Sequence, residues 1–141
     1  MTEVSIHVDA PPERVWPTLV AVEQWPELTP SVTSVESLDG TGLESGRRFR
    51  VTQPRLGTAV WRVTEVVPPR AFTWSTSRAG VTTTGIHQVL ARPAGGSDVT
   101  LTIEHRGALA PLVRLLYGRL TRRYMELEAV GLKRRSESSV S

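Results

Sequence analysis

Hydrophobic and polar residues alternate strictly at the start of the chain. Residues 3–9, EVSIHVD, place two valines and one isoleucine on one face and Ser5, His7 and Asp9 on the other. A period of two predicts a β-strand that is buried on one side.

A short helix is predicted to follow this strand. Asp9 can cap its amino end, and Pro11 and Pro12 fit a first turn, where a proline removes no needed hydrogen bond. Its apolar side is formed by Val15, Trp16, Leu19 and Val20. Pro17 keeps this helix short, and residues 24–30, QWPELTP, interrupt the chain again.

Short segments rich in valine and threonine, separated by turn sequences, follow from Val32 onward. They are SVESL, RRFRVTQP, TAVWRVTEVV, AFTWSTS, TTTGIHQVLAR and DVTLTIEHRG. The last two are joined by PAGGS, which is typical of a hairpin turn. Because the connections are short, these strands are predicted to form an antiparallel meander.

The hydrophobic period then lengthens to that of a helix. Apolar positions recur at intervals of three or four residues, at Leu109, Val113, Leu116, Leu120, Tyr124, Leu127 and Gly131. This stripe predicts one helix over residues 109–135, about 40 Å long. The polar residues 136–141, SESSVS, are expected to be a disordered tail, so residues 1–135 form a single domain.

The order of these elements, β-α-β6-α, predicts an α+β fold. An antiparallel sheet of about seven strands needs an apolar cover on one face, and only the last helix is long enough to supply it. A strongly twisted sheet can curl around such a helix. The periodicity leaves open whether side chains fill the space between the two.

Composition narrows the class of protein. The chain has 141 residues and no cysteine, which excludes disulfides, thiolate metal sites and cysteine nucleophiles. The first residues lack the pattern of a signal peptide, and no segment approaches the roughly 18 apolar residues that span a bilayer. We therefore expect a soluble, cytoplasmic protein without membrane insertion.

The basic residues do not indicate nucleic-acid binding. The net charge is only +3, and 16 of the 17 basic residues are arginines, most of them scattered. The one dense group lies on the last predicted helix, at Arg114, Arg119, Arg122, Arg123, Lys133, Arg134 and Arg135. No aromatic–basic interleaving accompanies it, so this group is interpreted as a solvated helix face.

Several motifs, in this order along nearly the whole chain, resemble the START-like or SRPBCC superfamily. They are IHVDAPPERVW (6–16), VEQWPELTPSV (22–32), QPRLGTAVWRVTEVVPPRAFTW (53–74), GIHQVL (85–90) and GLKRR (131–135). This superfamily includes polyketide cyclase/dehydrase-like and birch-pollen-allergen-like proteins. The resemblance implies a helix-grip fold, in which a curved antiparallel sheet and a long carboxy-terminal helix enclose a hydrophobic cavity.

The resemblance also implies which side chains line the cavity, namely those that share a face with the apolar strand positions. On the strands these are Phe49, Val51, Gln53, Trp61, Val63, Phe72, Trp74, His87, Val89, Leu101, Ile103 and His105. On the helix they are Val113, Leu116, Leu120, Tyr124 and Leu127. For each aliphatic residue an ordinary core position is the favoured interpretation, whereas the large indoles of Trp61 and Trp74 can also shape a pocket wall.

Two histidines are candidate acid–base residues. If PAGGS forms the turn, His87 falls opposite Ile103 and His105 lies on the diagonal, about 7–8 Å away. Imidazole is the side chain most easily tuned for proton transfer near neutral pH. The alternative is that each histidine is hydrogen-bonded at a strand end. Gln53 and Tyr124 could donate neutral hydrogen bonds to a ligand.

Other chemistry has no support in the sequence. No third ligand joins the histidines for zinc, and no phosphate loop or nucleophile elbow is present, so no metal or cofactor is expected. The favoured hypothesis is a cavity that binds a lipid, polyketide or aromatic metabolite. The alternatives are a cyclase or dehydratase that uses His87 or His105, and a protein-interaction module that uses the arginine-rich helix. We expect a monomer or a weak homodimer.

Overall fold

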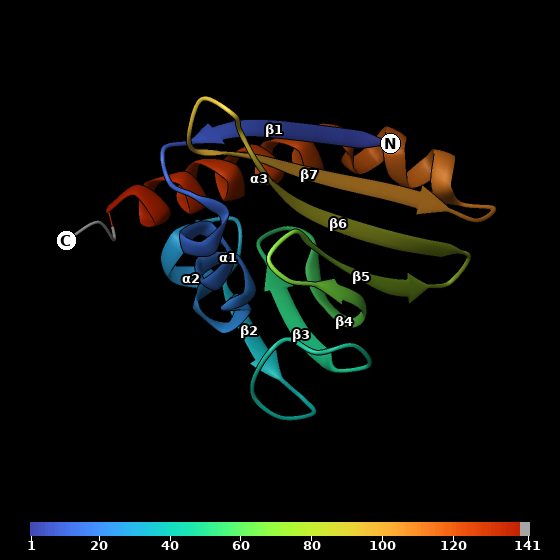
Figure 1. Ribbon diagram of the computed structural model, residues 1–141. Helices are drawn as coiled ribbons and strands as arrows, with labels where there is room; N and C mark the ends of the chain where they lie inside the picture. The colour runs from blue at the N-terminus through green and yellow to red at the C-terminus, as the bar shows by residue number, and fades with distance from the viewer. Residues whose placement is uncertain (139–141) are drawn as a thin grey trace.

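The computed structural model describes residues 1–138, which form a curved antiparallel sheet wrapped around one long helix (Figure 1). The strands are β1 (Thr2–Val8), β2 (Ser34–Ser37), β3 (Arg48–Gln53), β4 (Gly57–Val67), β5 (Ala71–Arg78), β6 (Val81–Ala91) and β7 (Ser97–Arg106). The helices are α1 (Pro12–Val20), the 3-10 turn η1 (Val22–Gln24), α2 (Trp25–Leu28) and α3 (Ala110–Ser138).

The seven strands form one sheet in the order β1-β7-β6-β5-β4-β3-β2. Strands β2 to β7 follow one another as a meander, and β1 pairs with β7, with Thr2 opposite Ile103 and Val8 opposite Ser97. All neighbours are antiparallel. The predicted β-α-β6-α order and the seven-stranded α+β fold are confirmed.

The sheet is curved, with β1 and β7 packed against α3 and β2 packed against η1 and α2. A register shift between Val63 and Glu65 marks a bulge in β4, and a bulge bends its strand and increases the local twist. Helices α1 and α2 occupy one end of the concave face, beside the carboxy-terminal half of α3 (Figure 1). The amino-terminal half of α3 has no such neighbour, which leaves room for a cavity there.

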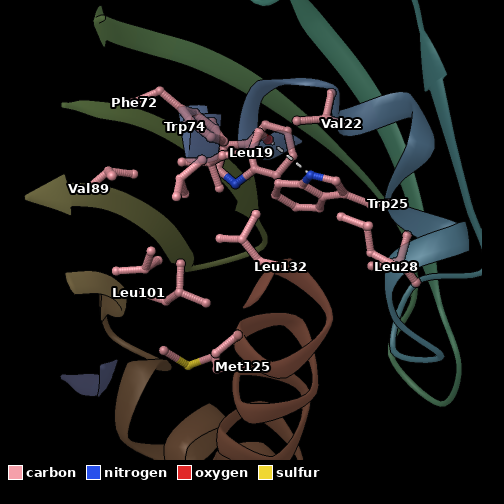
Figure 2. Packing of buried hydrophobic residues seen from close by; sticks show 14 of the residues in the cluster. Leu19, Val22, Trp25, Leu28, Phe72, Trp74, Val89, Leu101, Met125 and Leu132 are labelled. Carbon is pink, nitrogen blue, oxygen red and sulfur yellow. Dashed lines mark hydrogen bonds between the residues drawn. The ribbon is translucent and has the colours of Figure 1, made fainter. Parts of the chain in front are cut away.

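The main core lies between the strands, α1, α2 and the carboxy-terminal half of α3. Met125 and Leu132 of α3 face Leu101 of β7 and the α2 residues Trp25 and Leu28 (Figure 2). The inner faces of the strands contribute the fully buried residues Phe49, Val63, Phe72, Val89 and Val99. Burial of each large apolar side chain contributes roughly 1.5–3 kcal/mol.

The long helix differs from its prediction in two respects. It continues to Ser138 instead of ending at Arg135, and the side chain of Ser136 is buried, so residues 136–138 belong to the domain. The rest of the predicted disordered tail, residues 139–141, lies outside the described residues. Within residues 1–138, no helix is long and apolar enough to cross a membrane.

The buried residues of α3 coincide only in part with the predicted stripe. Tyr124 and Gly131 are buried as predicted, whereas Leu116 is 63% exposed and Leu120 and Leu127 are only half-buried. The buried residues outside the stripe include Met125, Ala129 and Leu132. The missing side chain of Gly131 leaves the α3 backbone in close contact with the carbonyl oxygen of Leu28.

The amino-terminal connection corrects two further predictions. Asp9 does not cap α1; the N-cap residue is Pro11, in an extended conformation and without a side-chain hydrogen bond. The Asp9 carboxylate instead accepts a hydrogen bond from His7 Nε2 at 2.9 Å. Residues 24–30 were predicted to interrupt regular structure, but they include the helix α2, whose Trp25 is buried.

Candidate functional site

A cavity of about 420 Å³ lies between the amino-terminal half of α3 and the inner face of the sheet. Its walls come from α2, from strands β3 to β7 and from α3. Most of the lining is apolar or aromatic, with a small number of polar side chains. This size and composition are typical of small-molecule sites, which range from roughly 300 to 1,000 Å³.

The cavity opens to solvent where α3 begins. Its mouth is lined on the α3 side by Leu109, Leu112 and Leu116, which are 46%, 49% and 63% exposed. The β5–β6 hairpin lies opposite, and the Leu109 amide donates a hydrogen bond to the Gly80 carbonyl at 3.3 Å. Two leucines of the predicted stripe, Leu109 and Leu116, therefore lie at the rim of a cavity and not in the core.

Indole rings form the inner part of the cavity. Trp74 is packed between Trp25, at a centroid distance of 5.3 Å, and Trp61, at 5.4 Å. Trp25 is held in place by its indole N–H, which donates to the Leu19 carbonyl at 3.0 Å (Figure 2). Gly85 pairs with Trp74 across the strands, and a Cβ atom there would be 3.1 Å from the indole, so only glycine leaves full room for this ring.

His87 lies at the floor of the cavity, stacked on Phe72. The ring centroids are 4.0 Å apart and the planes differ by 6°. The Phe72 carbonyl accepts a hydrogen bond from His87 Nδ1 at 3.4 Å, which leaves Nε2 as the acceptor nitrogen. Burial lowers the pKa of His87 to about 4, against the weaker opposing effect of that hydrogen bond. The ring is therefore neutral at physiological pH.

His105 lies nearer the mouth and does not meet His87. The register of β6 and β7 places His87 opposite Leu101 and His105 opposite Thr83, with Gly85 and Ile103 paired between them. The two histidines are thus about 13 Å apart along the strand. The predicted diagonal pair was wrong because the hairpin closes at Ala91 and Ser97, which shifts the register.

His105 has its own partners in the structure. Its Nδ1 and the Thr83 hydroxyl are 2.8 Å apart, and its carbonyl accepts from Arg114 at 3.1 Å. Partial burial lowers the pKa of His105, and the Arg114 charge adds to this effect. In the described part of the chain, neither histidine has a carboxylate partner that would orient it as a general base.

Glu128 of α3 also lies at the floor, where the cavity meets a second, much smaller pocket of about 20 Å³. Trp25 and His87 line both spaces together with Glu128. Within residues 1–138, no hydrogen bond or ion pair reaches the Glu128 carboxyl group. Burial without a compensating partner raises the pKa of this carboxyl to about 7.

Two polar side chains form hydrogen bonds between segments of the cavity wall. Tyr124 of α3 donates its hydroxyl to the Pro54 carbonyl at 2.5 Å, which joins the helix to the β3–β4 turn. Gln53 donates its amide to the Ser31 carbonyl at 3.2 Å, which leaves the amide oxygen as an acceptor. Both side chains line the cavity and are already fixed in orientation.

The predicted cavity residues fall into two groups in the structure. Those on the cavity wall are Val51, Gln53, Trp61, Trp74, His87, Ile103, His105, Val113, Leu116 and Tyr124. Those that do not line it are Phe49, Val63, Phe72, Val89, Leu101, Leu120 and Leu127. The strand residues of the second group, Phe49, Val63, Phe72, Val89 and Leu101, are buried core, because α1, α2 and α3 fill that end of the concave face.

Sequence reasoning missed two residues of the floor. Trp25 was overlooked because its segment was interpreted as a break between elements. Glu128 was not among the candidate residues, although it lies four residues after Tyr124 and four before Leu132. That helical spacing places all three on one face and could have identified it.

The described part of the chain contains no candidate metal site. Among residues 1–138, no group of three or more histidine, aspartate or glutamate side chains is arranged to hold a metal ion.

Comparison with known proteins agrees with this architecture. A family model described as "Polyketide cyclase / dehydrase and lipid transport" matches residues 2–137. No curated protein sequence matches the chain.

Solved structures with the same fold are numerous. TTHA0849 from Thermus thermophilus has a TM-score of 0.78 at 21% identity, with 99% of each chain covered. The Zhui aromatase/cyclase from a Streptomyces species has a TM-score of 0.82 at 19% identity, covering 99% of this chain and 94% of that one. Ara h 8.0201 has a TM-score of 0.73 at 17% identity, covering 98% and 97%. At these identities the similarity establishes the fold alone.

Proposed function

The chain belongs to the polyketide cyclase/dehydrase and lipid transport family, and on this premise we propose that it binds a small hydrophobic molecule in the cavity between the sheet and α3. The observation that carries the proposal is the cavity itself, about 420 Å³ of open space lined by Trp25, Trp61 and Trp74. Interiors of folded proteins are normally close-packed, so a space of this size needs an explanation.

The lining favours a compact, planar ligand. Indole faces make offset or edge contacts with other aromatic rings, and such contacts add to the stabilisation from burial alone. The Gln53 amide oxygen and the His87 Nε2 atom supply hydrogen-bond acceptors that can orient a ligand. A polyketide or an aromatic metabolite fits this description better than a lipid with two acyl chains.

The alternative, acid–base catalysis by cavity histidines, receives less support from the geometry. His87 and His105 lie too far apart to act on one small group, and burial lowers the pKa of each. A ring with a pKa of about 4 is a weak base at neutral pH. Binding therefore remains the favoured function.

A fluorescence titration tests the proposal. N-phenyl-1-naphthylamine is neutral, apolar and brighter in a dry environment, and we expect saturable binding at one site. Ala59→Trp should weaken this binding by about tenfold or more, because Ala59 lines the cavity and an indole there would fill it. Val60→Trp is the matched control, since Val60 is the next residue of β4, is 42% exposed and does not line the cavity.

Circular dichroism and thermal melts should confirm that both variants are folded. Equal binding by the parent and Ala59→Trp would place the fluorophore outside the cavity and contradict the proposal. Absence of binding by the parent at micromolar concentrations would contradict it as well.

A further inference from the structure

Among residues 1–138, the carboxyl group of Glu128 has no counter-charge. On α3, the residues one turn away are Tyr124, Met125, Gly131 and Leu132, none of which is cationic. The described residues offer it neither a hydrogen bond nor an ion pair. Glu128 is half-buried, and an acid that is drawn into an apolar environment is normally paired, because an isolated charge there is strongly destabilising.

The other ionisable groups of the cavity do not neutralise this acid. Arg78 of β5 is exposed at the mouth, where its guanidinium donates a hydrogen bond to the Thr58 carbonyl. His87 from β6 and His105 from β7 have lowered pKa values, so both are biased toward the neutral form. The remaining titratable groups, Tyr117 and Tyr124 of α3, are phenols. Within residues 1–138, the inner part of the cavity is therefore lined by one acid and by no cationic side chain.

Aromatic rings line the same cavity as this acid. Trp25 lines the junction of the two spaces together with Glu128, and Trp74 lies 5.3 Å from Trp25 between ring centroids. The face of an indole attracts a cation, and the attraction is stronger where water is excluded. A cavity that is lined by both a carboxylate and indole rings can thus offer an ammonium group an ion pair and cation–π contacts.

These observations point to one class of ligand. We propose that the cavity selects organic cations, with a ligand ammonium group paired with Glu128 at the floor and the apolar body of the ligand against the indoles. This inference rests on the proposed function, because it assigns a ligand class to the same cavity. A neutral ligand would leave the carboxyl unpaired, and an anionic ligand would be repelled by its ionised form.

Two ligands of nearly the same shape test the inference. At pH 8, 2-naphthylmethylamine is mostly a cation, whereas 2-naphthylmethanol is neutral. Displacement of N-phenyl-1-naphthylamine gives the affinity of each, and we expect the amine to bind about tenfold more tightly to the parent. This preference should shrink by about tenfold at pH 5.5, because the Glu128 carboxyl, with a pKa of about 7, is then protonated.

Two variants test whether Glu128 itself, and not another acid of α3, causes the preference for the amine. Glu128→Gln keeps the shape of the side chain and should abolish the preference for the amine at pH 8. Glu126→Gln is the matched control, since Glu126 is exposed on the same helix and should leave the preference intact. Thermal melts of both variants verify folding.

The possible outcomes distinguish the two proposals. If 2-naphthylmethanol and N-phenyl-1-naphthylamine bind but the amine is not preferred, the cavity binds ligands and the inference on cations is wrong. Retention of the preference in Glu128→Gln would also overturn it. If none of the three compounds binds the parent, the proposed function fails, and the inference fails with it.

Discussion

The backbone of α3 at Gly131 lies directly against the carbonyl oxygen of Leu28, with no room for a side chain between them. This contact joins the longest helix to α2, and it fixes which face of α3 points inward. The contact also holds Trp25, at the start of α2, over the floor of the cavity. Gly131 therefore connects helix packing to the shape of the candidate site.

Gly131→Ala should destabilise the protein by about 1–3 kcal/mol, because the added methyl group forces α3 and α2 apart. Gly118→Ala is the matched control on the same helix, where a Cβ atom would meet nothing within 4 Å. That change should stabilise the protein by about 0.5–1 kcal/mol through helix propensity. Urea unfolding of both variants measures the difference, and equal effects would contradict the close contact.

Glu128 should make the stability of the protein fall as pH rises. Its pKa in the folded state is about 7, above the reference value of 4.5, so the folded state binds the proton more tightly. The contribution of Glu128 to the free energy of unfolding is therefore largest below pH 4.5, and it falls by about 3 kcal/mol as pH rises through 7. Glu128→Gln removes this pH dependence. The free energy of unfolding of the variant, relative to that of the parent, should therefore increase between pH 5 and pH 8.

Denaturant midpoints at the two pH values measure this effect. For Glu126→Gln, on the exposed side of α3, the difference in stability from the parent should be the same at both pH values. A Glu128→Gln variant whose advantage is the same at both pH values would show that Glu128 is solvated and not buried.

His87 should remain neutral down to acidic pH. Burial lowers its pKa from 6.5 to about 4, so the folded state binds the proton less tightly than the unfolded state. The contribution of neutral His87 to the free energy of unfolding is therefore largest above pH 6.5, and it is lost as pH falls through 4. A proton NMR titration should show a His87 resonance that is flat between pH 8 and 5.5, and a midpoint near 6.5 would contradict the burial.

Tyr124→Phe should destabilise the protein by about 0.5–1.5 kcal/mol, because the Pro54 carbonyl loses its hydrogen-bond donor. The variant should also loosen the β3–β4 turn where it forms part of the cavity wall. Tyr117→Phe serves as the control, since Tyr117 lies at the mouth and is 41% exposed. Hydrogen exchange of the backbone amides in the β3–β4 turn is measured in both variants. Equal exchange rates would show that the Tyr124 hydroxyl does not hold the turn.

The strands could be predicted from the sequence because each carries a period of two and ends at a turn signal. Phe49, Val51 and Gln53 lie on one face of β3, as their alternation requires. The pairing of His87 could not be predicted to the residue, since a glycine-rich turn can close in several registers. The actual closure at Ala91 and Ser97 moved its partner by two positions.

The boundary between core and cavity was the harder part to predict. An apolar residue has the same pattern in either environment, so Phe72 and Trp74 looked equivalent, although only Trp74 lines the cavity. What separates them is the position of α1 and α2, which no local periodicity encodes. Glu128 was missed for a related reason, because an acid on a helix is usually solvated and only the packing of α3 against the sheet and α2 makes this one half-buried.

One measurement tests the binding of a small apolar molecule in the cavity most directly, because the chain has four tryptophans and three of them line it. A ¹H–¹⁵N spectrum resolves the four indole N–H signals during a titration with N-phenyl-1-naphthylamine. We predict that the signals of Trp25, Trp61 and Trp74 shift with one common dissociation constant, while that of Trp16, outside the cavity, stays in place. Unchanged signals from the three cavity indoles, or an equal shift of Trp16, would contradict binding in the cavity.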